Sequence, residues 1–196
     1  MSRALGSRAG RSCSGGFWAA ARRSLGGLFG PRHRRHRSLA IVAALHTRFW
    51  LWLLRPLRRR PLVAIGLVEH FGDVVAAEPI ARAVRRRHPH ARLLWCVRPA
   101  FAPLLRGHPA LDGVFSVRCL TAWSRLRRSR AFAAVYDLHL SGRSCAVCDL
   151  PIERAEAGAA ASVHGYYHHG PLLHAFCRAA GLPLLDDDPR PLPATR

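Results

Sequence analysis

The sequence predicts an α/β fold in which a Rossmann-like parallel sheet is flanked by helices. From Pro61 onward, short apolar runs alternate with stretches of helical spacing, which is the pattern of strands joined by crossover helices. The first run is apolar from Leu62 to Val68, as expected of a strand buried on both faces of a parallel sheet. It is followed by the turn Phe71-Gly72-Asp73, and the ends of such strands are where α/β folds place their chemistry.

The elements follow one another in a regular order. The alternation predicts strand 62–69, helix 74–87, strand 91–97, short helix 100–106, strand 113–117, helix 121–130 and strand 133–140. Proline supports two boundaries, because His88-Pro89 follows the first helix and Arg98-Pro99 follows the second strand. Such a series implies right-handed crossovers. Beyond Gly142, residues 155–161 and 171–180 have helical composition.

The chain of 196 residues can hold one domain of ordinary size with extensions. Residues 1–37 are rich in Gly, Ser and Arg, and we predict a basic disordered extension there. Residues 38–60 predict an apolar and basic helix. The Rossmann-like domain is expected over 61–185, and 186–196 reads as a linker or tail.

The helix expected over 38–60 has two interpretations of equal weight. His46, Thr47 and Arg48 interrupt its apolar run, so it falls short of the ~20 apolar residues of a membrane-spanning helix. With Trp50 and Trp52 flanked by arginines, it suits an anionic membrane interface. It suits equally well a helix that packs on the surface of its own domain. A secretory signal is not expected, because the preceding basic region is long and no small-residue cleavage site follows.

Charge and cysteine content limit the function classes. The formal net charge is +20, and the first 60 residues carry +14 of it, with no acidic residue. Every basic residue is Arg, which with the abundant Ala, Gly and Pro indicates a GC-rich genome more than phosphate binding. A nucleic-acid partner is therefore not expected. Six cysteines are too few for a disulfide scaffold and favour a reducing cytoplasm: Cys13, Cys96, Cys119, Cys145, Cys148 and Cys177.

Several motifs occur in an order that resembles a known family. They are FGDVV at 71–75, EPIARAVRRRHP at 78–89, ARLLWCVRP at 91–99, FAPLLRGHPALDGVFSV at 101–117 and YDLHL at 136–140. This order resembles glycosyltransferase family 9, the heptosyltransferase-like group, over about residues 61–140, with a looser likeness at 170–183. The resemblance implies the N-terminal, acceptor-side domain of a GT-B glycosyltransferase. Since the sequence ends where the second, donor-binding domain would begin, we expect a truncated enzyme.

The resemblance also implies an activity. It is inverting, metal-independent transfer of a sugar from a nucleotide-sugar donor to a lipopolysaccharide-type or other glycan acceptor, which could be lipid-linked. The nucleotide sugar is a co-substrate, and no cofactor is expected. The expected location is the cytoplasm, with peripheral attachment to the inner membrane through residues 38–60. The alternative is a non-catalytic remnant, a module derived from the acceptor-binding domain that binds a membrane or a partner.

Most candidate site residues follow the first strand, and one, Arg143, follows the fourth strand at the carboxyl edge of the sheet. Asp73 aligns with the acid that serves as the family's catalytic base, a role that suits a carboxylate on a cleft-facing loop. Its structural alternative is an N-cap of helix 74–87, worth ~1 kcal/mol. We expect Glu69, His70 and Gly72 to contact the acceptor, although the first two could be solvated loop residues and Gly72 could only permit a tight turn. Arg143 could meet a phosphate on the acceptor, or it could be one of the many surface arginines.

Two other features carry weaker signals. Gly66 is not part of a G-x-G-x-x-G motif, so a dinucleotide site is not predicted. Cys145-Ala-Val-Cys148 has the spacing of a zinc knuckle or a redox pair. Because no second close cysteine pair accompanies it, we expect a thiol pair and no metal, and Cys145 and Cys148 remain weak metal candidates. Histidines that could lie nearby are His139, His164, His168 and His169.

Overall fold

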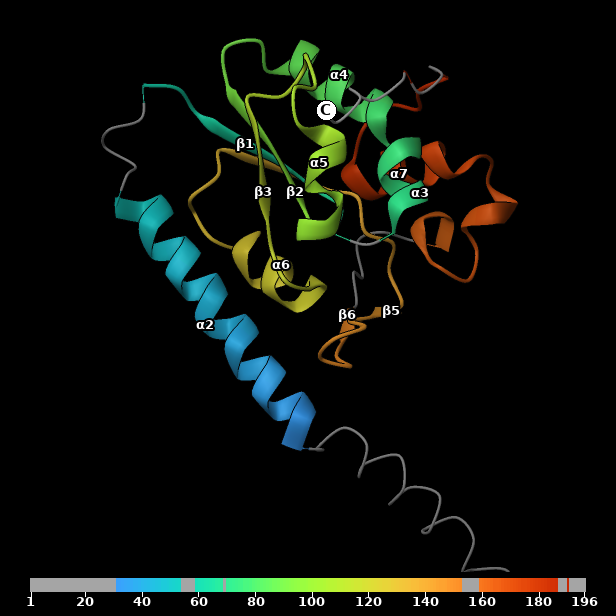
Figure 1. Cartoon of the computed structure of the whole chain (residues 1–196). Coiled ribbons are helices and arrows are strands. Elements are labelled where there is room, and N and C mark those ends of the chain that lie inside the picture. Colours follow the sequence, from blue (N-terminus) through green and yellow to red (C-terminus); the bar gives the residue numbers. More distant parts are fainter. Residues whose placement is uncertain (1–30, 54–58, 69, 153–158, 187–189, 191–196) are drawn as a thin grey trace, which may run out of the picture.

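The computed structural model describes residues 31–53, 59–68, 70–152, 159–186 and 190 (Figure 1). Some predictions fall wholly or partly outside these residues. They include the contact by Glu69, the disorder of residues 1–30, residues 54–58 of the helix at 38–60, most of the helix at 155–161 and most of the tail at 186–196.

The core of the fold is a parallel sheet of four strands, as predicted. The strands are β1 (Leu62–Gly66), β2 (Arg92–Val97), β3 (Gly113–Ser116) and β4 (Ala134–Asp137), in the order β3-β2-β1-β4. Every residue of β1 is buried, because this strand pairs with β2 on one side and β4 on the other. Its apolar run therefore reflects burial on both faces.

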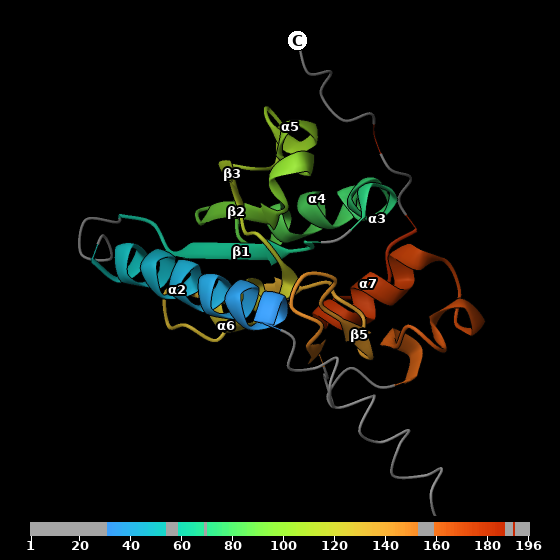
Figure 2. The same cartoon turned by 60° about the horizontal axis from the view of Figure 1, so that its bottom comes forward.

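Helices cover both faces of the sheet (Figure 2). Odd positions of β1, such as Val63 and Ile65, belong to a core shared with α4 (Glu78–Arg87), α5 (Ala102–Leu105) and α7 (Leu172–Ala180). Ala64, on the opposite face, packs in a second core with α2 (Pro31–Leu53) and α6 (Leu120–Leu126). The two cores make this a three-layer α/β domain.

The strand order creates a switch point beside β1. The connections through α4 and then α5 place β2 and β3 on one side of β1, and the connection through α6 on the opposite face brings β4 to its other side. Ligands of open α/β sheets bind outside the carboxyl ends of the strands at such a point. The loops that follow β1 and β4 therefore border the candidate site.

The predicted helix 74–87 is wrong in its boundaries. It consists of two helices, α3 (Phe71–Ala76) and α4, separated at Ala77. Pro79 lies in the first turn of α4, where its missing N–H costs nothing, but the same residue could not continue a helix begun earlier. Since α3 begins at Phe71, Asp73 lies within its first turn and is not an N-cap. The N-cap position belongs to His70, which makes no side-chain capping bond.

Helix α2 begins earlier than expected and packs on the domain. The basic run 32–37, assigned above to a disordered extension, is helical, so that prediction is wrong for these residues. Ala40 and Ala44 are buried in the second core and let α2 approach α6 (Figure 2). Packing on the domain's own surface is thus confirmed. In the described part of the chain, no helix has the length and apolar character needed to cross a membrane.

Segments after β4 were less predictable. A short hairpin of β5 (Arg143–Ser144) and β6 (Pro151–Ile152) was not predicted. Two 3-10 turns follow, η3 (Ala159–Ala161) and η4 (Tyr166–His168). The helix predicted over 171–180 is confirmed as α7, which ends at Gly181 in the left-handed conformation (φ 64°).

Gly66 has a packing role at the end of β1. A Cβ atom at this position would lie 2.0 Å from the indole ring of Trp123 in α6. Trp123 is fully buried, and its Nε1–H donates a hydrogen bond of 3.0 Å to Asp137 Oδ1, so the ring is held in place. The glycine is required for close packing of helix on strand, and no dinucleotide is needed to explain it.

Three of the motif residues, Glu78, Arg82 and His108, form a largely buried polar cluster away from the sheet edge. Glu78 of the EP motif accepts hydrogen bonds from Arg82 Nε (3.0 Å) and Nη2 (3.1 Å). His108 of the GHP motif lies with Nε2 3.0 Å from Glu78 Oε1, and both side chains are almost fully buried. The Arg190 backbone N–H donates to Oε2 at 2.9 Å. These residues join α4 to the β2–β3 connection, so their role is structural.

Candidate functional site

The candidate site brings together a carboxylate and a guanidinium from the two loops at the switch point. Asp73 comes from the first turn of α3, after β1, and Arg143 is the first residue of β5, after β4. Arg143 Nη1 lies 3.6 Å from Asp73 Oδ2, and the two side chains are 20% and 15% exposed. The pair is therefore shielded from bulk water on most sides while still accessible to a ligand.

A cationic pocket of about 480 Å³ adjoins this pair. It is lined by His70, Arg98, Arg143, Ser144, Ala146, Val163 and Tyr166. Three of these residues follow the ends of three different parallel strands: His70 follows β1, Arg98 follows β2 and Arg143 follows β4. Two guanidinium groups beside aromatic and hydroxyl groups suit a polar ligand that carries negative charge. Arg98 was missed as a site residue, although its place after a strand was visible in the sequence.

His70 adopts an unusual backbone conformation. Its φ is 47° and its ψ is 132°, a region that costs a non-glycine residue of order 1–3 kcal/mol. Such strain is concentrated at functional sites, and His70 lines the pocket. The sharp change of direction after β1 is thus made by His70.

Gly72 is not the residue that makes this turn. Its φ is not in the left-handed region, and a Cβ atom built on it would meet nothing within 4 Å. The space beside Gly72 is therefore open, and the tight-turn alternative is not supported, while contact of Gly72 with an acceptor stays a prediction.

A buried polar network lies beneath the site. The Val68 backbone N–H donates to His139 Nε2 at 2.9 Å, so Nε2 is an acceptor and the ring proton is on Nδ1. Nδ1 lies 2.6 Å from Asp137 Oδ1, and Arg127 Nε lies 3.2 Å from Asp137 Oδ2. The network ties the loop after β1 to the end of β4. Polar residues in YDLHL, at the end of an otherwise apolar strand, were the signal that could have revealed it.

The negative charge of Asp137 also acts on the Cys96 thiol in β2. Burial, together with the negative charge of Asp137, raises the pKa of the Cys96 thiol well above its ordinary value. Cys96 is accordingly a neutral core residue of β2, as the sequence indicates.

The two cysteines singled out by spacing are buried, and a third cysteine joins them. Cys119, from the connection between β3 and α6, lies with Cys145 and Cys148, and their sulfur atoms are all within 4.8 Å of one another. His139 has both ring nitrogens in the network described above. Among the described residues, this cysteine group includes none of the histidines that the sequence brought into consideration: His139, His164, His168 and His169.

Comparison with solved structures finds the glycosyl transferase family 9 protein from Veillonella parvula DSM 2008, with 16% sequence identity and a TM-score of 0.36. The match covers 41% of this chain and 26% of that chain, so the chain spans about a quarter of that protein's length. No protein-family model matches the chain, and no curated protein is similar to it. The assignment of an α/β fold therefore rests on the sheet topology. The similarity of the chain to a family 9 glycosyltransferase is weak.

Proposed function

We propose that this chain is the acceptor-side domain of a family 9, GT-B glycosyltransferase, with Asp73 as the catalytic base. The observation that carries the proposal is the Asp73–Arg143 pair, which stands at the β1/β4 switch point beside a cationic pocket. The order of motifs in the sequence supports the same family. Neither the composition nor the charge points to a competing enzyme class.

The reaction follows from the chemistry of a carboxylate in this position. Asp73 takes the proton of an acceptor hydroxyl while that oxygen attacks the anomeric carbon of the nucleotide sugar. The bond between the anomeric carbon and the nucleotide phosphate breaks, the phosphate leaves with the electron pair, and the configuration inverts. Arg143 favours the ionised form of Asp73, because a cation close to a carboxylate stabilises its charge.

The pocket would hold the acceptor. Arg98 and Arg143 can bind phosphate or carboxylate groups of a lipopolysaccharide-type glycan. His70 and the open space beside Gly72 border the path by which the acceptor hydroxyl reaches Asp73. The donor is a nucleotide sugar bound by a second domain, which another part of the protein or another chain would supply.

Replacing Arg143 with Ala is expected to weaken acceptor binding. The loss of one charge-assisted hydrogen bond costs about 1.5–3 kcal/mol, or roughly tenfold to hundredfold in affinity. The measurement is calorimetric titration of the chain with a phosphorylated lipopolysaccharide oligosaccharide. Arg92→Ala is the matched control, since Arg92 is an exposed residue at the opposite, amino end of β2. Equal loss in both variants, or none in Arg143→Ala, would show that the pocket is not the acceptor site.

A second role, peripheral binding to an anionic membrane at its cytoplasmic face, is favoured by the outward face of α2. This helix packs on the domain through small residues, Ala40 and Ala44, while its large apolar residues point outward. The exposed residues are Leu39, Val42, Leu45, Phe49, Trp50 and Trp52. An apolar face that the domain leaves uncovered needs another apolar surface to cover it.

The charge around this face favours anionic lipid as the cover. A pocket of about 380 Å³ at the end of α2 is lined by Arg48, Trp52, Arg128, Ser129, Arg130 and Ala131. Three arginines beside an exposed tryptophan match a lipid phosphate above an acyl layer, with the indole ring at the boundary. We therefore propose that α2 lies in the headgroup region of the membrane and holds the domain at the surface that carries a lipid-linked acceptor.

The membrane role predicts selective binding to anionic vesicles. Sedimentation with vesicles containing phosphatidylglycerol should retain the chain, and vesicles of phosphatidylcholine alone should retain much less. The double variant Phe49→Ala, Trp52→Ala should bind roughly tenfold more weakly or worse, because each ring loses its buried apolar area. Tyr167→Ala, which removes an exposed ring from another part of the surface, should bind as wild type does. Lipid-free dimerisation abolished by the double variant would instead assign this face to a second copy of the chain.

A further inference from the structure

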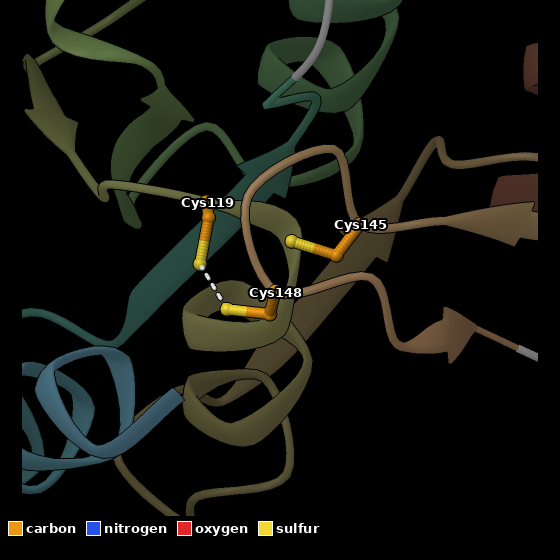
Figure 3. Close-up of side chains that lie close together, drawn as sticks. All are labelled: Cys119, Cys145 and Cys148. Atoms are coloured by element: carbon orange, nitrogen blue, oxygen red, sulfur yellow. Dashed lines mark hydrogen bonds between the residues drawn. The ribbon is translucent and has the colours of Figure 1, made fainter. Parts of the chain in front are cut away.

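Three buried thiols meet at a point where two connections of the fold come together (Figure 3). Cys119 precedes α6, and Cys145 and Cys148 belong to the loop between β5 and β6. Cys119 Sγ and Cys148 Sγ are 3.7 Å apart, and the three sulfur atoms lie within 4.8 Å of one another. Among the described cysteines, none forms a disulfide.

We propose that Cys119, Cys145 and Cys148 bind a single thiophilic cation, Zn²⁺, with the fourth position taken by water or by the Thr121 hydroxyl. The spacing of the sulfur atoms fits one ion. Thiolates about 2.3 Å from a tetrahedral zinc lie about 3.8 Å from one another, which the Cys119–Cys148 pair already matches. Soft thiolate ligands select zinc or copper(I) over magnesium and calcium.

The cysteine loop is already shaped to present its two thiols. The Cys145 backbone N–H donates to Leu150 O at 2.8 Å, and the Asp149 N–H donates to Cys145 O at 2.7 Å. Asp149 has φ 52°, the left-handed conformation that closes this turn. Cys145 and Cys148 therefore face the same side of the loop (Figure 3), so binding requires little reordering of the backbone.

Hydrogen-bond donors gather around the sulfur atoms, most of them at Cys145. The backbone N–H groups of Thr121 and Cys148 point at Cys145 Sγ, and that of Ala122 points at Cys119 Sγ. The Thr121 hydroxyl is buried beside the Cys145 and Cys148 thiols, which are its hydrogen-bonding neighbours. Hydrogen-bond donors of this kind orient and support metal-bound thiolates.

The site would also stabilise the wall of the candidate pocket. Strands β5 and β6 pair over two residues each, too few to be stable alone. Arg143 and Ser144 precede Cys145 in the sequence, and Ala146 lies inside the cysteine loop. Arg143, Ser144 and Ala146 all line the candidate pocket. A cation bound to Cys145, Cys148 and Cys119 would fix this hairpin against α6 and hold Arg143 near Asp73.

The test is metal binding by the full chain, purified in reductant without a metal-affinity tag. We expect one zinc per chain, and cobalt(II) in its place should give intense thiolate-to-cobalt absorption, which histidine-rich surfaces cannot produce. Removal of zinc by a chelator should lower the melting temperature by about 5 °C or more. Each of Cys119→Ser, Cys145→Ser and Cys148→Ser should abolish the absorption. Cys177→Ala is the control, because Cys177 is equally buried but belongs to the core on the other face.

A measurement on the wild-type chain keeps the proposal testable should the variants not fold. Alkylation mapped by mass spectrometry should find Cys119, Cys145 and Cys148 protected with zinc bound and reactive after chelation. Cobalt binding without thiolate absorption, or absorption unchanged in Cys119→Ser, would overturn the proposal. A Cys119–Cys148 disulfide formed in the presence of excess zinc would overturn it as well and would assign the cluster to redox chemistry.

Discussion

Replacing Asp73 with Asn is expected to reduce sugar transfer by about 10²–10⁴-fold, the usual contribution of a general base. The amide has the shape of the carboxylate but cannot accept the acceptor's proton. Folding should be affected little, because a partly exposed ion pair such as Asp73–Arg143 contributes about 1 kcal/mol or less. The loss therefore appears in transfer and not in stability.

The measurement is incorporation of labelled sugar from a panel of nucleotide sugars into a lipopolysaccharide-type acceptor. The assay uses cell extracts that contain the wild-type or the variant chain, so that any separate donor-binding domain is present. Asp186→Asn is the matched control, because this carboxylate is 92% exposed and does not line the pocket. Transfer at the wild-type rate by Asp73→Asn would reject the base role of Asp73.

Replacing Glu78 with Ala is expected to lower the free energy of unfolding by about 3–5 kcal/mol, the cost of breaking a buried ion pair from one side. The variant removes the carboxylate that accepts hydrogen bonds from the Arg82 guanidinium and pairs with the buried His108 ring. For a chain of this length the melting temperature should fall by about 10 °C. Urea unfolding followed by circular dichroism measures the change.

The stability of the fold at acid pH should also depend on the Glu78 carboxylate. Burial alone would raise the pKa of Glu78, but hydrogen bonds from the Arg190 backbone N–H, Arg82 and His108 outweigh it and hold the pKa below its ordinary value of 4.5. A group whose pKa is lower in the folded state stabilises the fold above its unfolded pKa, and this contribution is lost as the pH falls through the folded value. Wild-type stability should therefore fall more steeply below about pH 4.5 than that of Glu78→Ala.

Asp186→Ala provides the contrast for Glu78→Ala. Its carboxylate also contacts a histidine, His174 at 3.1 Å, but it is almost fully exposed, so the change should cost about 0.5 kcal/mol or less. Similar losses in both variants would mean that the Glu78 cluster is not a buried structural link.

The site was only partly visible in the sequence. Asp73, His70 and Gly72 could be placed at a strand end because a short apolar run stops at Val68 and a helical pattern follows. The left-handed backbone of His70 could not be foreseen, since the neighbouring glycine offers the easier explanation of a turn. The aromatic face of α2 was equally ambiguous, because an apolar helix carries no signal of which residues the domain leaves outside.

The sequence by itself determined the α/β alternation, because the spacing of apolar residues distinguishes strands from helices over a few residues. It also determined the position of Asp73 after β1. Only the tertiary structure decided that Arg143 faces Asp73 and that Cys119 joins Cys145 and Cys148. These groups are far apart along the chain, and their meeting depends on the strand order β3-β2-β1-β4. That order depends on which helices cover which face of the sheet, and it is set by packing over the whole domain, which local patterns do not record.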